Sequence, residues 1–150
     1  MTLLPALEAL PGVDIQRSVP LSQYTRFGIG GPVDFFIETP DEENFLHALR
    51  SVKKSGLPYL VLGGGTNLIV HDEGYRGVIL RFTGNAISGR DGSIHVAAGA
   101  VLQHLVDFSI EQSLEGLHTM TGIPGWVGAA IYGNAGAYGH SISEFVQQVR

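Results

Sequence analysis

The sequence Tyr59-Leu60-Val61-Leu62-Gly63-Gly64-Gly65-Thr66-Asn67-Leu68-Ile69-Val70 joins a short apolar run directly to three consecutive glycines. The apolar run 59–62 is typical of a buried strand. Glycines without Cβ atoms let the backbone lie close against a ligand and turn successive N–H groups toward an anion such as phosphate. The side chains of Thr66 and Asn67 add hydrogen-bond donors. A tight turn between two strands is the alternative, but one glycine would be enough for it, so the sequence favours a phosphate-binding loop.

This loop differs from the familiar phosphate-binding motifs. It has neither the Lys-Ser/Thr end of the nucleoside-triphosphatase loop nor the Gly-x-Gly-x-x-Gly of the dinucleotide-binding fold. The apolar residues Leu68–Val70 predict a second strand after Asn67. We therefore do not expect the helix N-terminus that those two folds place at the phosphate.

A strand and a helix are predicted immediately before the loop. Apolar residues alternate over Val33–Glu38, which predicts a strand. Thr39 is expected to cap the following helix, with Pro40 at its first position and Glu42 completing a capping box. Gly56 is expected to end the helix. The apolar face of this helix should consist of Phe45, Leu46, Leu49 and Val52, and its last turn should carry Lys53 and Lys54.

The segments before residue 33 are less regular. Leucines at helical spacing over residues 3–10, stopped by Pro11-Gly12, predict a short amphipathic helix within an N-terminal docking segment, residues 1–20. Residues 21–32 have no periodicity. They are consistent with either a connector or a loop that lines a ligand.

Further elements are predicted after the loop. Gly77–Phe82 should form a strand, and Arg90-Asp91-Gly92 is a hairpin turn leading into a strand over Ser93–Ala98. Apolar residues from Leu102 to Leu114 predict a second helix that ends near Gly116. A final strand is expected over Glu144–Val149.

A second glycine-rich stretch spans residues 122–139, Gly-Ile-Pro-Gly-Trp-Val-Gly-Ala-Ala-Ile-Tyr-Gly-Asn-Ala-Gly-Ala-Tyr-Gly. Its small residues present backbone at close range, and Gly125–Ile131 should form a short helix. Close packing of two protein elements is one interpretation. A flat aromatic ligand is the other, and the presence of a second glycine cluster favours it.

Composition bounds the function. The 150 residues are enough for one domain or two small lobes, and the 21 glycines are about twice the usual share. The net charge of −5 without a Lys/Arg cluster argues against nucleic acid as a partner. There is no cysteine, so disulfides and thiolate chemistry are excluded. The N-terminus has no signal-peptide pattern, no apolar run is long enough to span a membrane, and we expect a cytoplasmic protein.

Candidate catalytic and metal-binding residues are scarce. The six histidines are scattered and none has the spacing of a metal ligand pair, so no metal site is expected. His104 and Asp107 could share a helix face, but such a pair is usually solvated. No Ser-His-Asp arrangement stands out. The sequence therefore offers cofactor-binding features and no candidate catalyst.

Four motifs taken together resemble the UDP-N-acetylenolpyruvoylglucosamine reductase family, flavin enzymes of peptidoglycan precursor synthesis. They are Tyr24-Thr25-Arg26-Phe27-Gly28-Ile29-Gly30-Gly31, Leu62–Leu68, Gly122–Ala130 and Asn134–Gly139. Tyr24 stands where that family more often has Asn. The resemblance runs from about Leu21 to Arg150, with the motifs in family order.

The resemblance implies an α+β fold of the vanillyl-alcohol-oxidase type. Residues 21–82 would form a first FAD-binding lobe and residues 83–150 a truncated second lobe, with the flavin between them and the substrate domain absent. FAD would be held non-covalently, because residues 63–67 lack the histidine through which some relatives attach flavin. The implied FAD contacts are Thr25, Phe27, Leu62, Gly63, Gly64, Gly65, Thr66, Asn67, Leu68, Ile123, Gly125, Gly128, Ala129, Tyr132, Gly133, Ala135 and Gly136. Tyr138 corresponds to a family tyrosine near the substrate.

The family reaction, as the resemblance implies it, passes hydride from NADPH to FAD and then to the enolpyruvyl carbon of a UDP-sugar. The serine, arginine and glutamate that assist it would lie beyond this segment, and Arg150 comes too early to be that arginine. This chain by itself is therefore expected to be inactive. A stand-alone nucleotide-binding module and a different flavin oxidoreductase, such as a sugar or lactone oxidase, are the alternatives.

Overall fold

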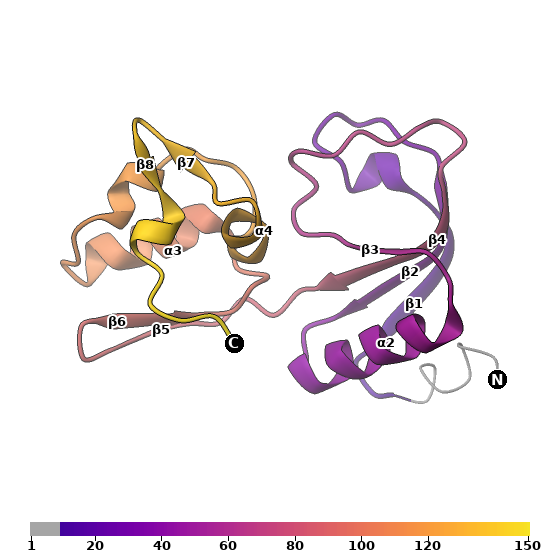
Figure 1. Cartoon of the computed structure of the whole chain (residues 1–150), viewed down its shortest axis with the longest axis horizontal. Helices are drawn as coiled ribbons and strands as arrows, with labels where there is room; N and C mark the ends of the chain where they lie inside the picture. The colour runs from indigo at the N-terminus through magenta and orange to yellow at the C-terminus, as the bar shows by residue number, and fades with distance from the viewer. Residues whose placement is uncertain (1–9) are drawn as a thin grey trace. The chain divides into compact units, whose positions relative to one another are not determined.

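The computed structural model describes residues 10–150, and these residues form two compact units that divide after Gly84 (Figure 1). The first unit contains a four-stranded sheet with one long helix. The second contains one longer helix, three short helical elements and two small hairpins. The mixed content agrees with the predicted α+β class. Each unit has its own hydrophobic core.

The sheet of the first unit has the strand order β1-β2-β4-β3. Its strands are β1 (Asp14–Pro20), β2 (Pro32–Thr39), β3 (Tyr59–Val61) and β4 (Tyr75–Phe82). β1 runs antiparallel to β2, whereas β2 and β3 both run parallel to β4. The predicted strands over residues 33–38, 59–62 and 77–82 are therefore present, each with slightly different ends.

β1 was not predicted, and it lies within residues 1–20, which were expected to form an N-terminal docking segment. The helix expected over residues 3–10 lies almost entirely outside the described residues. Beyond it, Asp14–Pro20 pairs with β2, from Asp14 opposite Glu38 to Pro20 opposite Pro32. Only Val19 of this strand is buried, so its own apolar alternation is weak. Residues 14–20 therefore form a strand because they pair with β2, and not because of their own apolar pattern.

The two faces of the sheet are covered differently. Helix α2 (Glu42–Ser55) packs on one face. The other face is covered by the short 3₁₀ helix η1 (Leu21–Gln23) with the irregular residues 24–31, and by the irregular segment 62–74 (Figure 1). The central strands β2 and β4 are buried on both faces, as is typical of strands with parallel neighbours. The α2 face buries Ile37, Ala48, Val52, Val78 and Leu80, and the loop face buries Val19, Leu21, Val33, Phe36, Leu62 and Ile79.

The start of α2 differs from the prediction. Asp41, not Thr39, is the N-cap, and its carboxylate accepts a hydrogen bond from the Asn44 N–H at 2.8 Å. Thr39 remains the last residue of β2, buried and paired with Phe82. Thr39 is therefore part of the sheet, although the local motif predicts that it caps the helix. The other end is as predicted, with Lys53 and Lys54 in the last turn and Gly56 in the left-handed conformation.

The apolar face of α2 is also slightly rotated from the prediction. Phe45, Leu49 and Val52 pack on the sheet, but Leu46 is exposed and Ala48 is fully buried in its place. Helical spacing alone leaves this choice open, because Leu46 and Ala48 flank the predicted stripe on opposite sides.

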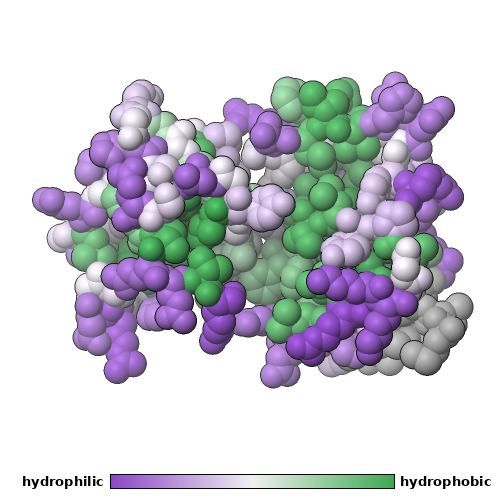
Figure 2. Space-filling model, in the orientation of Figure 1, coloured by the Kyte–Doolittle hydropathy of each residue, from purple (hydrophilic) through white to green (hydrophobic). Residues whose placement is uncertain are grey.

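β3 is exposed, which corrects its prediction as a buried strand. It is the edge strand, with β4 as its only neighbour in the sheet of the described residues. Val61 is 51% exposed, and Tyr59 and Leu60 are also exposed. Figure 2 shows hydrophobic residues gathered on the visible face of this unit over β3 and the loop that follows it.

The second strand expected at Leu68–Val70 is absent. Residues 62–74 form turns and extended backbone without strand pairing. Leu68 and Val70 still pack against the loop-face core, and Ile69 is exposed. Their alternation therefore reflects packing of an irregular loop, and not a place in the sheet.

The second unit begins with a hairpin. β5 (Ile87–Arg90) and β6 (Ser93–Val96) pair antiparallel through the two-residue loop Asp91-Gly92. Both loop residues have positive φ, as a type I′ turn requires. This confirms the predicted hairpin turn. β7 (Gly136–Ala137) and β8 (His140–Ser141) form a second, shorter hairpin around Tyr138-Gly139.

The core of the second unit lies between its helices. α3 (Leu102–Glu111) and α4 (Val127–Tyr132) confirm the two predicted helices. α3 ends at Glu111, before Leu114 and the end expected near Gly116, and α4 begins two residues later than expected. Short 3₁₀ helices cover Leu117–Met120 and Ile142–Glu144. The second of these, with residues 145–150 outside any regular element, replaces the strand expected over Glu144–Val149. The core consists of Ala100, Leu102, Leu105, Val106, Met120, Val127, Ala130 and Ile142.

Candidate functional site

The glycine loop begins where β3 ends, on the loop face of the sheet. The Leu62 N–H donates to the Leu80 carbonyl at 2.9 Å, which continues the sheet pairing by one residue. Leu62 is buried in the core beneath the loop. Gly63 and Gly64 are then partly exposed, and Gly65 is buried. The loop is therefore anchored at its start by the core and at its end by Gly65.

Gly65 cannot be another residue without moving the backbone. Its φ is +63°, in the left-handed region, and a Cβ added to it would overlap the carbonyl oxygen of Tyr24. Its own carbonyl accepts a hydrogen bond from the Arg26 N–H at 3.0 Å. The sequence interpretation had all three glycines facing a ligand. At Gly65 the close neighbour is instead the protein segment 24–26.

The segment 24–26 is itself fixed by a side chain. Thr25 is buried, and its Oγ1 donates to the Ile29 carbonyl at 2.8 Å. Farther along, Gly31 and Gly74 leave no room for side chains, because a Cβ on Gly31 would overlap the Asp72 carbonyl oxygen and one on Gly74 would overlap the Pro32 carbonyl oxygen. The ambiguous segment 21–32 is thus held against the segment 62–74 by backbone contacts at both ends, at Gly65 and at residues 72–74.

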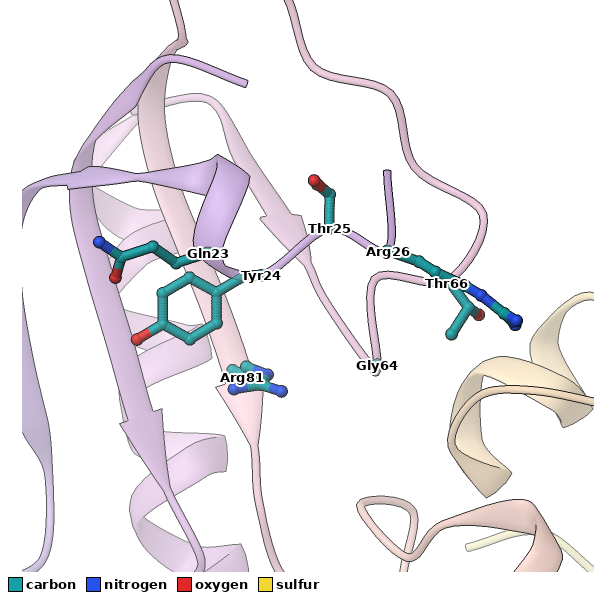
Figure 3. Close-up of a pocket in the computed structure, with 7 residues that line it drawn as sticks. All are labelled: Gln23, Tyr24, Thr25, Arg26, Gly64, Thr66 and Arg81. Atoms are coloured by element: carbon teal, nitrogen blue, oxygen red, sulfur yellow. The ribbon is translucent and has the colours of Figure 1, made fainter. Parts of the chain in front are cut away.

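These two segments form a pocket of about 430 Å³ (Figure 3). In Figure 3 the side chains of Arg26 and Thr66 lie beside each other to the right of Gly64, and Arg81 lies to its left. The lining residues are Gln23, Tyr24, Thr25, Arg26, Gly64, Thr66 and Arg81. Thr25, Gly64 and Thr66 were predicted as cofactor contacts. Gln23, Tyr24, Arg26 and Arg81 were not, because no motif assigned a role to their side chains.

Arg81 organises this pocket from β4. Its Nη1 donates to Glu38 Oε1 at 2.7 Å, and its Nε donates to the Gly63 carbonyl at 3.2 Å. The guanidinium also lies over the Tyr24 ring, 5.1 Å from its centroid. The Arg81 and Glu38 side chains are only 16% and 18% exposed. Such a sheltered pair, bonded to the loop backbone, fixes the position of Gly63.

The chemistry of the lining residues suits a phosphate group. The residues that line the pocket include Gly64, Thr66, Gln23 and Arg26, which carry a backbone N–H, a hydroxyl, an amide and a guanidinium. None of the lining residues carries a carboxylate. Hydrogen-bond donors with a net positive charge are what an anion requires. The residues present therefore fit the diphosphate of a dinucleotide cofactor.

The remaining predicted contacts of the first unit fall into two groups. Leu62 and Leu68 direct their side chains into the core of the loop face. Phe27 and Asn67 are exposed, on the segments that flank the pocket. The first group therefore supports the loop, whereas the second is accessible to a ligand.

In the second unit, several predicted contacts have protein neighbours. A Cβ on Gly128 would lie 2.8 Å from Ala98 Cβ, and the Gly128 N–H donates to the Ala98 carbonyl. A Cβ on Gly136 would overlap the His140 carbonyl oxygen across the β7–β8 hairpin. Ile123 and Ala135 pack against the core. Packing of protein elements, the alternative interpretation, thus accounts for these small residues.

Three other predicted contacts share an accessible face. Ala129, Tyr132 and Gly133 lie three and four residues apart on and just after α4, and all are exposed. Tyr132 is 96% exposed. Gly125, just before α4, has φ +125° and accepts a hydrogen bond from the Leu102 N–H. The structure therefore brings together one accessible group in this unit.

Tyr138 lies apart from that group in the β7–β8 turn. It has φ +55° and is 91% exposed. The neighbouring Glu144 carboxylate bonds to His140 Nδ1 at 2.9 Å and accepts from the Ser141 N–H at 2.6 Å. The His140 hydrogen bond, then that of Ser141, holds the pKa of Glu144 below its usual value.

Neither a metal centre nor a membrane span is found in the described part of the chain. No three His, Asp or Glu side chains among residues 10–150 are grouped so that they could hold a metal ion. Among the same residues, every helix is too short or too polar to cross a bilayer.

A family model and individual relatives both match this chain. The model of the FAD binding domain family matches residues 33–150. The UDP-N-acetylenolpyruvoylglucosamine reductase of Solibacter usitatus is 55% identical over 144 residues, which are 96% of this chain and 46% of that protein. The enzyme of the same name from Geotalea uraniireducens is 37% identical over 138 residues, 91% of this chain and 46% of that protein. The chain thus spans about half the length of these curated relatives.

Solved structures agree with the sequence matches. The UDP-N-acetylenolpyruvylglucosamine reductase (MurB) of Thermus caldophilus superimposes with a TM-score of 0.67 at 32% identity, covering 86% of this chain and 45% of that one. CrmK, a flavoenzyme of caerulomycin biosynthesis, superimposes with a TM-score of 0.53 at 12% identity, over 69% of this chain and 22% of that one, and shows the shared fold alone. The phosphate-suited pocket, the fold and the family match lead to one conclusion: the chain belongs to the FAD binding domain family, with FAD as its cofactor.

Proposed function

We propose that this chain is the FAD-binding part of a reductase that converts UDP-N-acetylenolpyruvoylglucosamine to UDP-N-acetylmuramate with NADPH. The observation that carries the proposal is the 55% identity to a UDP-N-acetylenolpyruvoylglucosamine reductase over 96% of this chain. The reaction belongs to peptidoglycan precursor synthesis. The protein would act on a soluble UDP-sugar in the cytoplasm and contribute to cell-wall formation, cell shape and cell division.

In the first unit, the proposed role of the glycine loop is to hold the FAD phosphates. Gly64 brings the backbone to the pocket, Gly63 and Gly65 hold the loop in place on either side of it, and the side chains of Thr66 and Asn67 add donors. Thr25 contributes by fixing the segment that lies against Gly65. The remaining contacts proposed in this unit are Phe27, Leu62 and Leu68, the last two through their support of the loop.

In the second unit, the proposed contacts lie against the flavin part of the cofactor. The accessible group Ala129, Tyr132 and Gly133 offers two small residues and an exposed aromatic ring. Gly125 and Gly128 adjoin it, and Tyr138 is proposed to lie near the UDP-sugar. The further contacts proposed here are Ile123, Ala135 and Gly136.

When bound, FAD supplies the hydride chemistry, taking a hydride from NADPH and delivering it to the enolpyruvyl carbon. The residues of this chain bind and orient the cofactor, and we assign a catalytic role to none of them. We propose that FAD is held non-covalently, because residues 63–67 contain no histidine. Acid denaturation of the full-length flavoprotein should therefore release all of its flavin.

The test is NADPH oxidation by the full-length protein that contains this chain. We expect oxidation only when UDP-N-acetylenolpyruvoylglucosamine is present, with a product two hydrogens heavier by mass spectrometry. UDP-N-acetylglucosamine, which lacks the enolpyruvyl group, is the matched control and should give no oxidation. Turnover with oxygen in the absence of any UDP-sugar would contradict the proposal and favour an oxidase. Retained FAD without NADPH turnover would favour a binding module.

A further inference from the structure

The pocket beside the glycine loop contains two guanidinium groups with different surroundings. That of Arg81 is engaged by Glu38, by the Gly63 carbonyl and by the face of Tyr24. Its positive charge is therefore largely compensated by the Glu38 carboxylate 2.7 Å away. Arg81 is occupied in positioning the loop.

Arg26 has a fixed backbone and an accessible side chain. Its N–H donates to the Gly65 carbonyl at 3.0 Å, so the residue is anchored to the glycine loop itself. Its side chain is exposed, and within the described residues no ion pair to a carboxylate is formed by its guanidinium. Figure 3 shows it extending beside Thr66, on the side of Gly64 opposite Arg81.

The charges in the pocket follow from these two arrangements. The seven lining residues include Arg26 and Arg81 and no carboxylate. Because Glu38 compensates Arg81, the uncompensated positive charge is that of Arg26. The chain as a whole carries −5, so a doubly charged anion would be repelled by the protein unless a local cation offset it.

From this geometry we propose that the Arg26 guanidinium binds the diphosphate of FAD and makes the site selective for flavins that carry a diphosphate. The inference rests on the proposed role of the glycine loop in holding the FAD phosphates. A planar guanidinium can donate two parallel hydrogen bonds to phosphate oxygens, which an ammonium group cannot do. The backbone hydrogen bond to the Gly65 carbonyl places Arg26 beside the same loop that presents the backbone donors.

The test measures FAD affinity in the full-length protein after removal of its flavin. Flavin fluorescence titrations would give the Kd for the wild type and for R26Q, R26K and R50Q, at low and at high salt. Arg50 is also exposed but lies on α2, away from this pocket, so R50Q is the matched control for loss of one positive charge. The same titrations with riboflavin, which has no phosphate, test selectivity.

We expect R26Q to weaken FAD binding about tenfold, which corresponds to ~1.4 kcal/mol, and R26K to weaken it less. The salt dependence of FAD binding should fall in R26Q, because the contact it loses is electrostatic. R50Q should bind FAD as the wild type does, and riboflavin binding should be the same in R26Q and the wild type.

Two results would overturn the inference. One is an FAD affinity of R26Q equal to that of R50Q. The other is an equal loss of FAD and riboflavin binding in both R26Q and R26K, because this would mean that Arg26 maintains the shape of the pocket and does not contact the diphosphate. Failure of the wild-type protein to bind FAD at all would instead contradict the proposed function, and the two failures are thereby distinguished.

Discussion

Replacement of Gly65 by alanine should displace the glycine loop from the segment that it packs against. The added Cβ would overlap the Tyr24 carbonyl oxygen, which belongs to the backbone and cannot rotate away. Relief of this overlap requires a shift of the whole 24–26 segment. That shift would stretch the hydrogen bond from the Arg26 N–H to the Gly65 carbonyl, now 3.0 Å long.

The expected loss of stability has two parts. The first is the left-handed conformation of Gly65, φ +63°, which costs an alanine about 1 kcal/mol. The second is the displaced segment, where a weakened backbone hydrogen bond costs ~1 kcal/mol and disturbed packing adds to it. We expect a total decrease of about 2–4 kcal/mol in the free energy of unfolding.

Gly56 provides a matched control on the same unit. Its φ of +74° is similar, but a Cβ added to it meets nothing within 4 Å. Gly56→Ala should therefore show only the conformational part, about 1 kcal/mol. Urea unfolding of Gly65→Ala, Gly56→Ala and the wild type gives both values, and the difference between the two variants isolates the contact with Tyr24.

The same variants test the link between the loop and cofactor binding. Gly65→Ala should also weaken FAD binding, because the displaced loop no longer presents its donors at the pocket, whereas Gly56→Ala should not. If Gly65→Ala is no less stable than Gly56→Ala and binds FAD like the wild type, then the contact with Tyr24 does not position the loop and the reasoning is refuted.

Three further changes test other contacts. Arg81→Met should lower the free energy of unfolding by about 2 kcal/mol, because the sheltered Glu38 carboxylate loses its 2.7 Å partner. Urea unfolding should show that the double variant Arg81→Met/Glu38→Met regains part of this loss. An unchanged urea midpoint in Arg81→Met would contradict the prediction. The lowered pKa of Glu144 implies a stabilising contribution that is present above the ordinary value of 4.5 and is lost as pH falls through the folded-state pKa. NMR titration should show that His140→Ala raises the pKa of Glu144 toward 4.5. An unchanged pKa of Glu144 in this variant would exclude His140 as the main cause. Tyr132→Ala should leave stability unchanged, since Tyr132 is 96% exposed, and should weaken FAD binding if the ring contacts the cofactor as proposed; equal affinity in the variant would remove Tyr132 from the site.

Local patterns predicted the elements whose ends are set by local chemistry. Helix α2 was found from its apolar spacing, its terminal lysines and the Gly56 cap, all of which act within a few residues. The Asp91-Gly92 hairpin was found because a type I′ turn requires two residues that tolerate positive φ. The pattern failed at the start of α2, where Thr39 is a suitable cap but is held in β2 by its pairing with Phe82.

Elements that depend on distant neighbours were assigned incorrectly. β1 has little alternation of its own and exists through pairing with β2. β3 resembles a buried strand by composition, yet it is the exposed edge of its sheet. Leu68 and Val70 have the spacing of a strand without a partner strand, and pack as a loop. In each case the deciding contact lies outside the window in which periodicity is measured.

The sequence by itself determined that this chain carries two glycine-rich segments, no thiol chemistry and an α+β order of elements, because composition, backbone freedom and turn preferences are local properties. Only the tertiary structure decided what each glycine is for. It placed the Tyr24 carbonyl against Gly65 and Ala98 against Gly128, so some glycines serve protein packing and not a ligand. It also brought Arg26 and Arg81 to one pocket and compensated only Arg81 with Glu38. Glu38 and Arg81 are 43 residues apart in the chain, and their charges meet only because β2 and β4 pair in the sheet.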